Sequence, residues 1–167
     1  ALVSLSRGGA DATVTREFDL TTKTFVKDGF HIPEAKGELN WIDPDHVYVA
    51  TDFGPGSMTD SGYPRIVKRW TRGQRLEEAE IVFEGQASDL SVSASFDDTP
   101  GFERHFVHRQ IAFYKSHLFL RTTDGTLKRV EVPEDAQANA YREWLLITLR
   151  SPWTIQGQTY PSGALLV

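Results

Sequence analysis

Residues 117–132 read HLFLR-TTDG-TLKRVEV, and this stretch decides the fold class. Its Asp124-Gly125 pair lies between two segments rich in apolar residues. Asp-Gly at such a place is a strong hairpin signal, because both residues adopt the positive φ values that a tight turn between antiparallel strands requires. We therefore predict a β-hairpin with strands over 117–121 and 126–132.

The same pattern of strand, turn and strand extends in both directions. Glu38–Ile42 and His46–Ala50 flank Asp43-Pro44-Asp45, whose Asp and Pro residues favour a tight turn. One helix is expected, over Glu134–Arg142. Further strands are expected at Val14–Leu20, Thr24–Val26, Arg65–Thr71, Ala79–Phe83, Leu90–Phe96, Arg104–Tyr114 and Trp144–Arg150. The sequence therefore predicts an all-β protein.

The expected strands can be grouped in fours, in groups that begin near residues 39, 90 and 144. A propeller blade is one four-stranded antiparallel meander of roughly 40 to 50 residues. We therefore predict a partial β-propeller of about three four-stranded blades, divided as 1–36 (partial), 37–87, 88–135 and 136–167 (partial). A β-sandwich has the same turn frequency and is the alternative at this point.

Composition narrows the classes of function. With 167 residues, of which 40% are hydrophobic, the chain is long enough for one domain with a buried core. The net charge of −5 disfavours nucleic-acid partners. One basic cluster, within Arg65–Arg75, is followed closely by Glu77, Glu78, Glu80 and Glu84, which we expect to neutralise it. The absence of cysteine excludes disulfides and thiol catalysis.

The apolar runs of the sequence bear on its solubility and compartment, and its two ends bear on whether it is a fragment. No apolar run approaches the roughly 20 residues needed to span a bilayer, so we predict a soluble protein, in the cytoplasm first and the periplasm second. Ala1–Ser6 and Gly163–Val167 both resemble strand interiors, whereas natural termini are usually polar. We expect an excised fragment whose neighbouring strands are missing on both sides.

No string of residues matches a catalytic motif. A serine nucleophile elbow needs G-x-S-x-G on a strand-to-helix turn, and the nearest string, Gly54–Met58, lacks the second glycine. Asp52-Phe53-Gly54 spells the magnesium motif of kinases, but the other kinase elements are missing and we expect a turn. We predict that this chain contains no catalytic residue, no cofactor site and no metal site.

The histidines and the acidic turns are the remaining polar candidates. His105 and His108 lie in one expected strand at a spacing that directs them to opposite faces. Asp43, Asp45 and His46 resemble a metal site, but acidic residues in turns are far commoner than ligands. A second acidic pair, Asp97-Asp98, is expected to face solvent in a turn.

Three of the four tryptophans are candidates for the core. Trp41, Trp70 and Trp144 lie in or beside apolar strands, so they should fill the space between packed sheets rather than form a stacking platform. The alternative is a stand-alone β-sheet module that binds a carbohydrate or a protein partner.

Six strings of sequence, with the turns between them, carry a resemblance to a known family. They are Leu2–Ala12, Arg16–Asp19, Trp41–Asp43, Thr51–Gly54, Ser61–Arg65 and Arg142–Leu146. In this order they resemble the propeller of bacterial prolyl oligopeptidase family members, over essentially the whole chain. The resemblance implies a serine peptidase in which a seven-bladed propeller caps an α/β-hydrolase domain and admits only short peptides, which are cut after proline.

Under this resemblance the chain is a non-catalytic portion of that propeller, and the hydrolase domain with its Ser-Asp-His triad lies outside it. The implied partners are the hydrolase domain and short peptides, with no nucleic acid and no membrane. No residue of this chain matches a catalytic or substrate-contacting residue of the family. Self-association is expected through exposed blade faces and unpaired edge strands.

Overall fold

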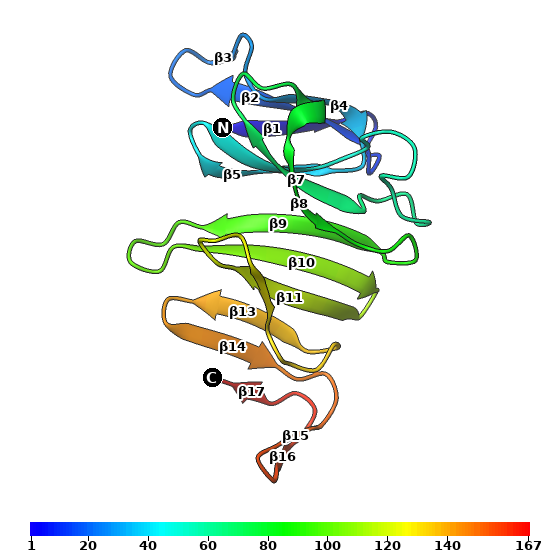
Figure 1. The fold of residues 1–167 in the computed structure, drawn as a ribbon, viewed down its shortest axis with the longest axis vertical. Coiled ribbons are helices and arrows are strands. Elements are labelled where there is room, and N and C mark those ends of the chain that lie inside the picture. The colour runs from blue at the N-terminus through cyan, green and yellow to red at the C-terminus, as the bar shows by residue number, and fades with distance from the viewer.

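The computed structural model describes all 167 residues as a succession of antiparallel sheets with one short 3-10 helix. Figure 1 shows four main sheets that follow one another along the long axis, from β1 near one end to β17 near the other. The fold is therefore all-β, as predicted. None of its helical segments has the length and apolar character that crossing a membrane requires.

The strands fill the sheets in chain order. Sheet I contains β1 (Leu2–Ser6), β2 (Thr13–Asp19), β3 (Thr24–Phe25) and β4 (His31–Ala35), all joined through β2. Sheet II contains β5 (Glu38–Asp43), β6 (His46–Ala50), β7 (Ile66–Thr71) and β8 (Glu80–Glu84), with the 3-10 helix η1 (Leu76–Glu78) before β8. Sheet III contains β9 (Ser91–Asp97), β10 (Arg104–Ala112), β11 (Lys115–Arg121) and β12 (Leu127–Arg129).

The C-terminal part forms sheet IV and a separate hairpin. Sheet IV contains β13 (Gln137–Tyr141), β14 (Trp144–Thr148) and β17 (Leu165–Leu166). The hairpin of β15 (Trp153–Ile155) and β16 (Gln158–Tyr160) lies between β14 and β17 in the chain. The number of blades and their boundaries stay predictions.

The hairpin predicted over 117–132 is confirmed. β11 pairs with β12, and Gly125 adopts a φ of 86° in the turn between them, whereas Asp124 does not adopt the positive φ expected of it. The Thr126 N–H donates to Asp124 Oδ1 over 3.0 Å, which fixes the turn. The second strand is shorter than expected and ends at Arg129.

The helix expected over Glu134–Arg142 is wrong, because this segment contains β13, which pairs with β14 along its whole length. Alanine has the highest helix propensity, and that propensity favoured the helix. However, Ala136, Ala138 and Ala140 alternate with polar residues at the period of two that marks a strand. Sheet IV therefore begins well before Trp144. The single strand expected over Arg104–Tyr114 ends at Ala112, where the chain turns into β11.

The core consists of two clusters, each between neighbouring sheets. The cluster between sheets I and II contains Phe30, Ile32, Leu39, Val47 and Val49. The cluster between sheets II and III contains Tyr48, Ala50, Val67, Val92, Ala94 and Val107. Alternate residues of β6 enter opposite clusters, because successive side chains of a strand point to opposite faces. We name the three contact regions seam I/II, seam II/III and seam III/IV.

Candidate functional site

The serine and aspartate in the motif-like strings serve a turn. Ser57 is buried, its hydroxyl oxygen accepts the Phe53 N–H over 2.8 Å, and the same oxygen lies 2.7 Å from the Gly54 carbonyl oxygen. The Asp52 carboxylate accepts the Gly54 N–H over 2.8 Å, which closes the predicted turn. These contacts shape the loop that leads from β6 to β7.

The two histidines of β10 point to opposite faces of sheet III, as predicted. His105 Nδ1 lies 2.8 Å from the Tyr48 hydroxyl in seam II/III. His108 Nε2 lies 3.4 Å from Ser95 Oγ on the other face. No three His, Asp or Glu side chains converge in a way that would hold a metal ion.

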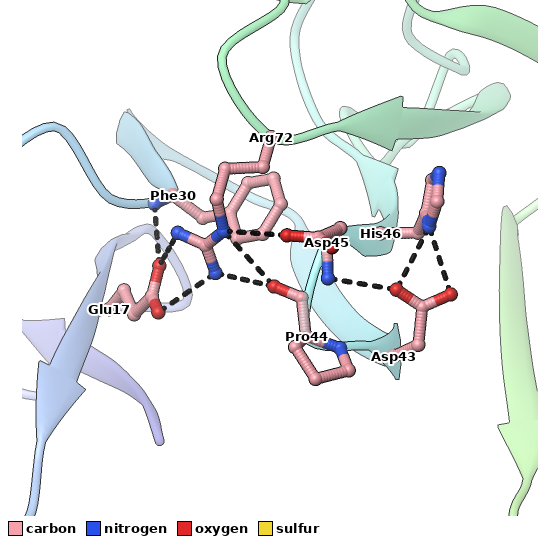
Figure 2. A network of polar contacts seen from close by, with 7 residues as sticks. All are labelled: Glu17, Phe30, Asp43, Pro44, Asp45, His46 and Arg72. Atoms are coloured by element: carbon pink, nitrogen blue, oxygen red, sulfur yellow. Dashed lines mark hydrogen bonds and ion pairs between the residues drawn. The ribbon is translucent and has the colours of Figure 1, made fainter.

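The turn acids between β5 and β6 bind separate partners, as Figure 2 shows. Both carboxylate oxygens of Asp43 lie 2.9 Å from His46 Nδ1, whereas an Asp45 carboxylate oxygen lies 3.5 Å from Arg72 Nε. Burial acts to raise the pKa of Asp43, but hydrogen bonds from His46 and from the Asp45 amide bring that pKa below its ordinary value. The three residues that resembled a metal site therefore form a turn, a histidine–carboxylate contact and an ion pair with Arg72.

Arg72 links sheets I and II through the network in Figure 2. Its Nη1 and Nη2 donate to the two carboxylate oxygens of Glu17 over 2.8 and 3.0 Å, and Nη2 also donates to the Pro44 carbonyl oxygen over 2.6 Å. Burial acts to raise the pKa of Glu17, but the hydrogen bonds from Arg72 and from the Phe30 amide lower the pKa below its ordinary value. The fork of guanidinium donors fixes the two sheets in one register.

An aromatic cluster lies beneath this ion pair. The Arg72 guanidinium carbon lies 4.7 Å from the ring centre of Phe30. The Phe30 ring makes edge contacts with Trp41 and Trp70 at centroid distances of 5.7 and 5.1 Å. These two tryptophans fill seam I/II, as predicted.

Three members of the basic cluster within Arg65–Arg75 form ion pairs, two of them with glutamates nearby in sequence, so the expected local neutralisation is only partial. Arg65 pairs with Glu84 over 2.6 Å and Arg75 with Glu78 over 3.1 Å, as expected. Arg72, however, pairs with Glu17 of β2, 55 positions away. Sequence patterns missed this contact because nothing local to either residue specifies the other.

Seam II/III is a solid apolar contact with polar links at its edges. Phe83 and Phe119 pack across it with ring centres 5.3 Å apart. The Asn40 side-chain amide donates to the Ala94 carbonyl oxygen over 2.9 Å, near one edge of each sheet. Arg121 Nη2 donates to Glu80 Oε1 over 3.1 Å. Together these contacts fix sheets II and III against each other, face to face.

A buried ion pair anchors the loop that leads into β9. Asp89 is 2% exposed, and its carboxylate oxygens accept Arg109 Nε and Nη2 over 2.8 and 2.9 Å. The Gln86 N–H donates to the same carboxylate over 2.7 Å. Because all of these donors favour the charged form, the loop is fixed against sheet III by an ionised Asp89.

Two expectations about single residues are wrong. The Asp97 side chain does not face solvent freely, because β9 and β10 place it opposite Arg104, to which it pairs over 2.8 Å. Trp144 is 52% exposed and does not fill a seam. It lies opposite Tyr141 in the β13–β14 pairing, on the face of sheet IV that is opposite to Ala138 and Ala140.

Seam III/IV is hollow. On the side of sheet III, β10 and β11 form the wall of this seam, through His108, Gln110, Ser116 and Leu118. Across from sheet III, β13 and the residue before it present only alanine methyl groups, at 136 and 138. A cavity of about 430 Å³ lies between β10, β11 and β13. No buried apolar cluster bridges sheets III and IV.

No family model matches the sequence. The chain is 34% identical over 172 residues to the uncharacterized peptidase y4nA of Sinorhizobium fredii (strain NBRC 101917 / NGR234), covering 99% of this chain and 24% of that protein. It is 29% identical over 179 residues to an uncharacterized peptidase of Rickettsia prowazekii (strain Madrid E), covering 99% of this chain and 25% of that protein. It thus spans about a quarter of the length of these curated relatives.

Solved structures show the same likeness. A post-proline cleaving enzyme from Rickettsia typhi matches with a TM-score of 0.89 and 29% identity, over 98% of this chain and 26% of that enzyme. A structure from a study of two prolyl endopeptidases matches in fold with a TM-score of 0.67 and 14% identity, over 87% of this chain and 22% of that one. The resemblance seen in the sequence is confirmed. The chain is therefore related, over nearly its whole length, to the propeller portion of prolyl oligopeptidase family peptidases.

Proposed function

We propose that this chain is a non-catalytic portion of the propeller of a prolyl oligopeptidase-like serine peptidase. In this proposal the propeller controls the access of short proline-containing peptides to an α/β-hydrolase domain that lies outside the chain. The chain itself needs no cofactor and no metal ion. The observation that carries the proposal is the match to a post-proline cleaving enzyme over 98% of this chain, with a TM-score of 0.89.

The packing of the seams supports a role as a rigid wall. Access control by size requires sheets that do not separate when a large substrate presses on them. Seam I/II is fixed by the Arg72–Glu17 pair and by the rings around Phe30, and seam II/III by a continuous apolar core. Such contacts exclude water and bulky chains, which is the physical task that the proposal assigns to the wall.

Substrate size selection tests the proposal. In a full-length protein that contains this chain, Arg72→Ala removes the guanidinium that ties sheet I to sheet II. We expect the rate of cleavage of an unfolded protein such as casein to rise relative to that of a chromogenic proline dipeptide. Arg7→Ala is the control, because the Arg7 side chain is 88% exposed and its distance to Glu34 is 3.7 Å.

The same experiment also distinguishes the proposed function from the alternative, a stand-alone binding module. An unchanged ratio in Arg72→Ala, with dipeptide cleavage retained, would contradict size selection by this wall. A full-length protein that cleaves neither substrate would favour a stand-alone module that binds a carbohydrate or a protein partner.

A further inference from the structure

The cavity in seam III/IV has the size of a ligand site. Its volume of about 430 Å³ falls within the roughly 300–1,000 Å³ typical of small-molecule pockets. Its walls come from β10, β11, the segment before β13, β13 itself and the residue Arg150. Because two sheets and a loop form it, the cavity is a feature of the folded seam rather than of one mobile loop.

One cationic group at this cavity has no anionic partner in the chain. The guanidinium carbon of Arg150 lies 3.9 Å from the ring centre of Tyr114, and Arg150 forms no ion pair. The one carboxylate in the lining, Asp135, accepts a hydrogen bond from the Ser151 hydroxyl instead. Stacking on Tyr114 orients the guanidinium and leaves its N–H donors for an external acceptor.

An uncovered aromatic pair stands beside this guanidinium. Phe113 and Tyr114 form the turn between β10 and β11, with ring centres 4.8 Å apart, and their side chains are 76% and 56% exposed. Both residues line the cavity. The site therefore presents an apolar surface next to an unpaired positive charge.

Apart from Arg150 and Asp135, the polar residues of the lining are a histidine, a serine and three with amide side chains. His108 has contact with solvent through the cavity, yet the surrounding protein shields it and lowers its pKa below the ordinary value. Gln137 and Asn139 alternate with the alanines of β13, so their side chains point to the other face and only their backbone borders the cavity. One guanidinium in a lining that also contains the Asp135 carboxylate favours a monoanion over a polyanion, because Asp135 repels any further negative charge.

We propose that this cavity binds a small carboxylate that bears an aromatic or other apolar group. Arg150 holds the carboxylate, and Phe113 and Tyr114 contact the apolar group. The same chemistry is found in free arylalkyl carboxylates and in the C-terminal residue of a peptide. The proposal goes beyond the wall function and does not depend on it.

Titration of the 167-residue chain, followed by NMR or by tyrosine and tryptophan fluorescence, tests the site. The probes are N-acetyl-phenylalanine, 3-phenylpropionate and, as the neutral match, N-acetyl-phenylalanine amide. We expect the acid to bind at least about tenfold more tightly than its amide, because only the acid pairs with Arg150. Equal affinity for N-acetyl-phenylalanine and 3-phenylpropionate would identify a general carboxylate site. Tighter binding of N-acetyl-phenylalanine than of 3-phenylpropionate would identify a site for peptide C-termini.

Substitutions in the lining test whether the ligand binds in this cavity. Arg150→Gln should weaken binding of the acid about tenfold, and the remote Arg7→Gln should leave it unchanged. Phe113→Ala should weaken acid and amide alike. Ala138→Leu, which fills the cavity, should abolish binding, with far-UV circular dichroism confirming that the chain is folded. An acid that binds no better than its amide, or an Arg150→Gln variant that binds like the parent, would overturn the proposal.

Discussion

β9 and β13 occupy the same place in their sheets, since each begins a sheet and faces the sheet before it, yet they produce opposite seams. β9 directs Val92, Ala94 and Phe96 into seam II/III, which is solid. The start of β13 presents two alanines to sheet III, and a cavity of about 430 Å³ lies there. The comparison teaches that the backbone arrangement sets the seams, whereas side-chain volume decides whether a seam becomes a core or a binding space.

The largest effect is expected where a charge enters the solid seam. Val92→Asp places an unpaired carboxylate at a position that is 2% exposed, and we expect a loss of more than about 4 kcal/mol in unfolding free energy. Ser95→Asp, on the other face of the same strand, should cost less than about 1 kcal/mol. Urea unfolding monitored by circular dichroism measures both, and equal losses would mean that the two faces of β9 do not differ as described.

The same substitution in both seams sharpens the comparison. Ala94→Leu adds volume to a position that is 1% exposed and should destabilise the fold by about 1–3 kcal/mol through overpacking. Ala138→Leu adds that volume to a cavity wall and should change the unfolding free energy by less than about 0.5 kcal/mol or increase it. Thermal melting of the two variants checks this, and the reverse order would show that seam III/IV is filled in solution.

The free energy of unfolding should depend on pH through the buried carboxylate of Asp89. Burial acts to raise the pKa of Asp89, but hydrogen bonds from Arg109 and from the Gln86 amide lower that pKa below its ordinary value of 3.8. A lowered folded-state pKa means that the stabilisation is present above pH 3.8 and is lost as the pH falls through the lower folded-state value.

Asp89→Asn removes this ionisation and should cost about 2 kcal/mol at pH 7, because Arg109 loses its charged partner. Denaturant unfolding of parent and variant at a series of pH values down to about pH 2 measures the difference, which should shrink with acidity. A difference that stays constant with pH would rule out the Asp89 carboxylate as its source.

The smallest effect on stability is expected at the exposed face of sheet IV, which Tyr141, Trp144 and Leu165 share by the strand register. Tyr141, Trp144 and Leu165 are 63%, 52% and 61% exposed, and we propose that they promote self-association. Trp144→Thr should lower the weight-average mass in sedimentation at high protein concentration, while unfolding free energy changes by less than about 0.5 kcal/mol. A parent chain that sediments as a monomer under these conditions would contradict the proposal.

The features that were predictable from the sequence are those with local causes. The turn at Asp124-Gly125 was predicted, although only Gly125 adopts the positive φ expected of both residues. The opposite directions of His105 and His108 follow from the period of a strand. The Arg65–Glu84 pair was within reach because both residues lie in one sheet.

The features that were missed depend on which faces meet in space. Arg72 and Glu17 are joined only because sheets I and II stack. The alanines around β13 suggested a helix by propensity, and their small volume matters only because they face β10 and β11 across the cavity. The cavity beside Arg150 was therefore not predictable from the sequence. If the alternating alanines had been interpreted as a strand, they would have indicated that only small side chains face sheet III there.

The most direct test of the central claim is hydrolysis of a chromogenic proline-containing dipeptide, measured with the 167-residue chain and with a full-length protein that contains it. We predict cleavage by the full-length protein and none by the chain alone, because the proposed function makes the chain a wall and places the nucleophile in a hydrolase domain outside it. Cleavage by the isolated chain would contradict the account.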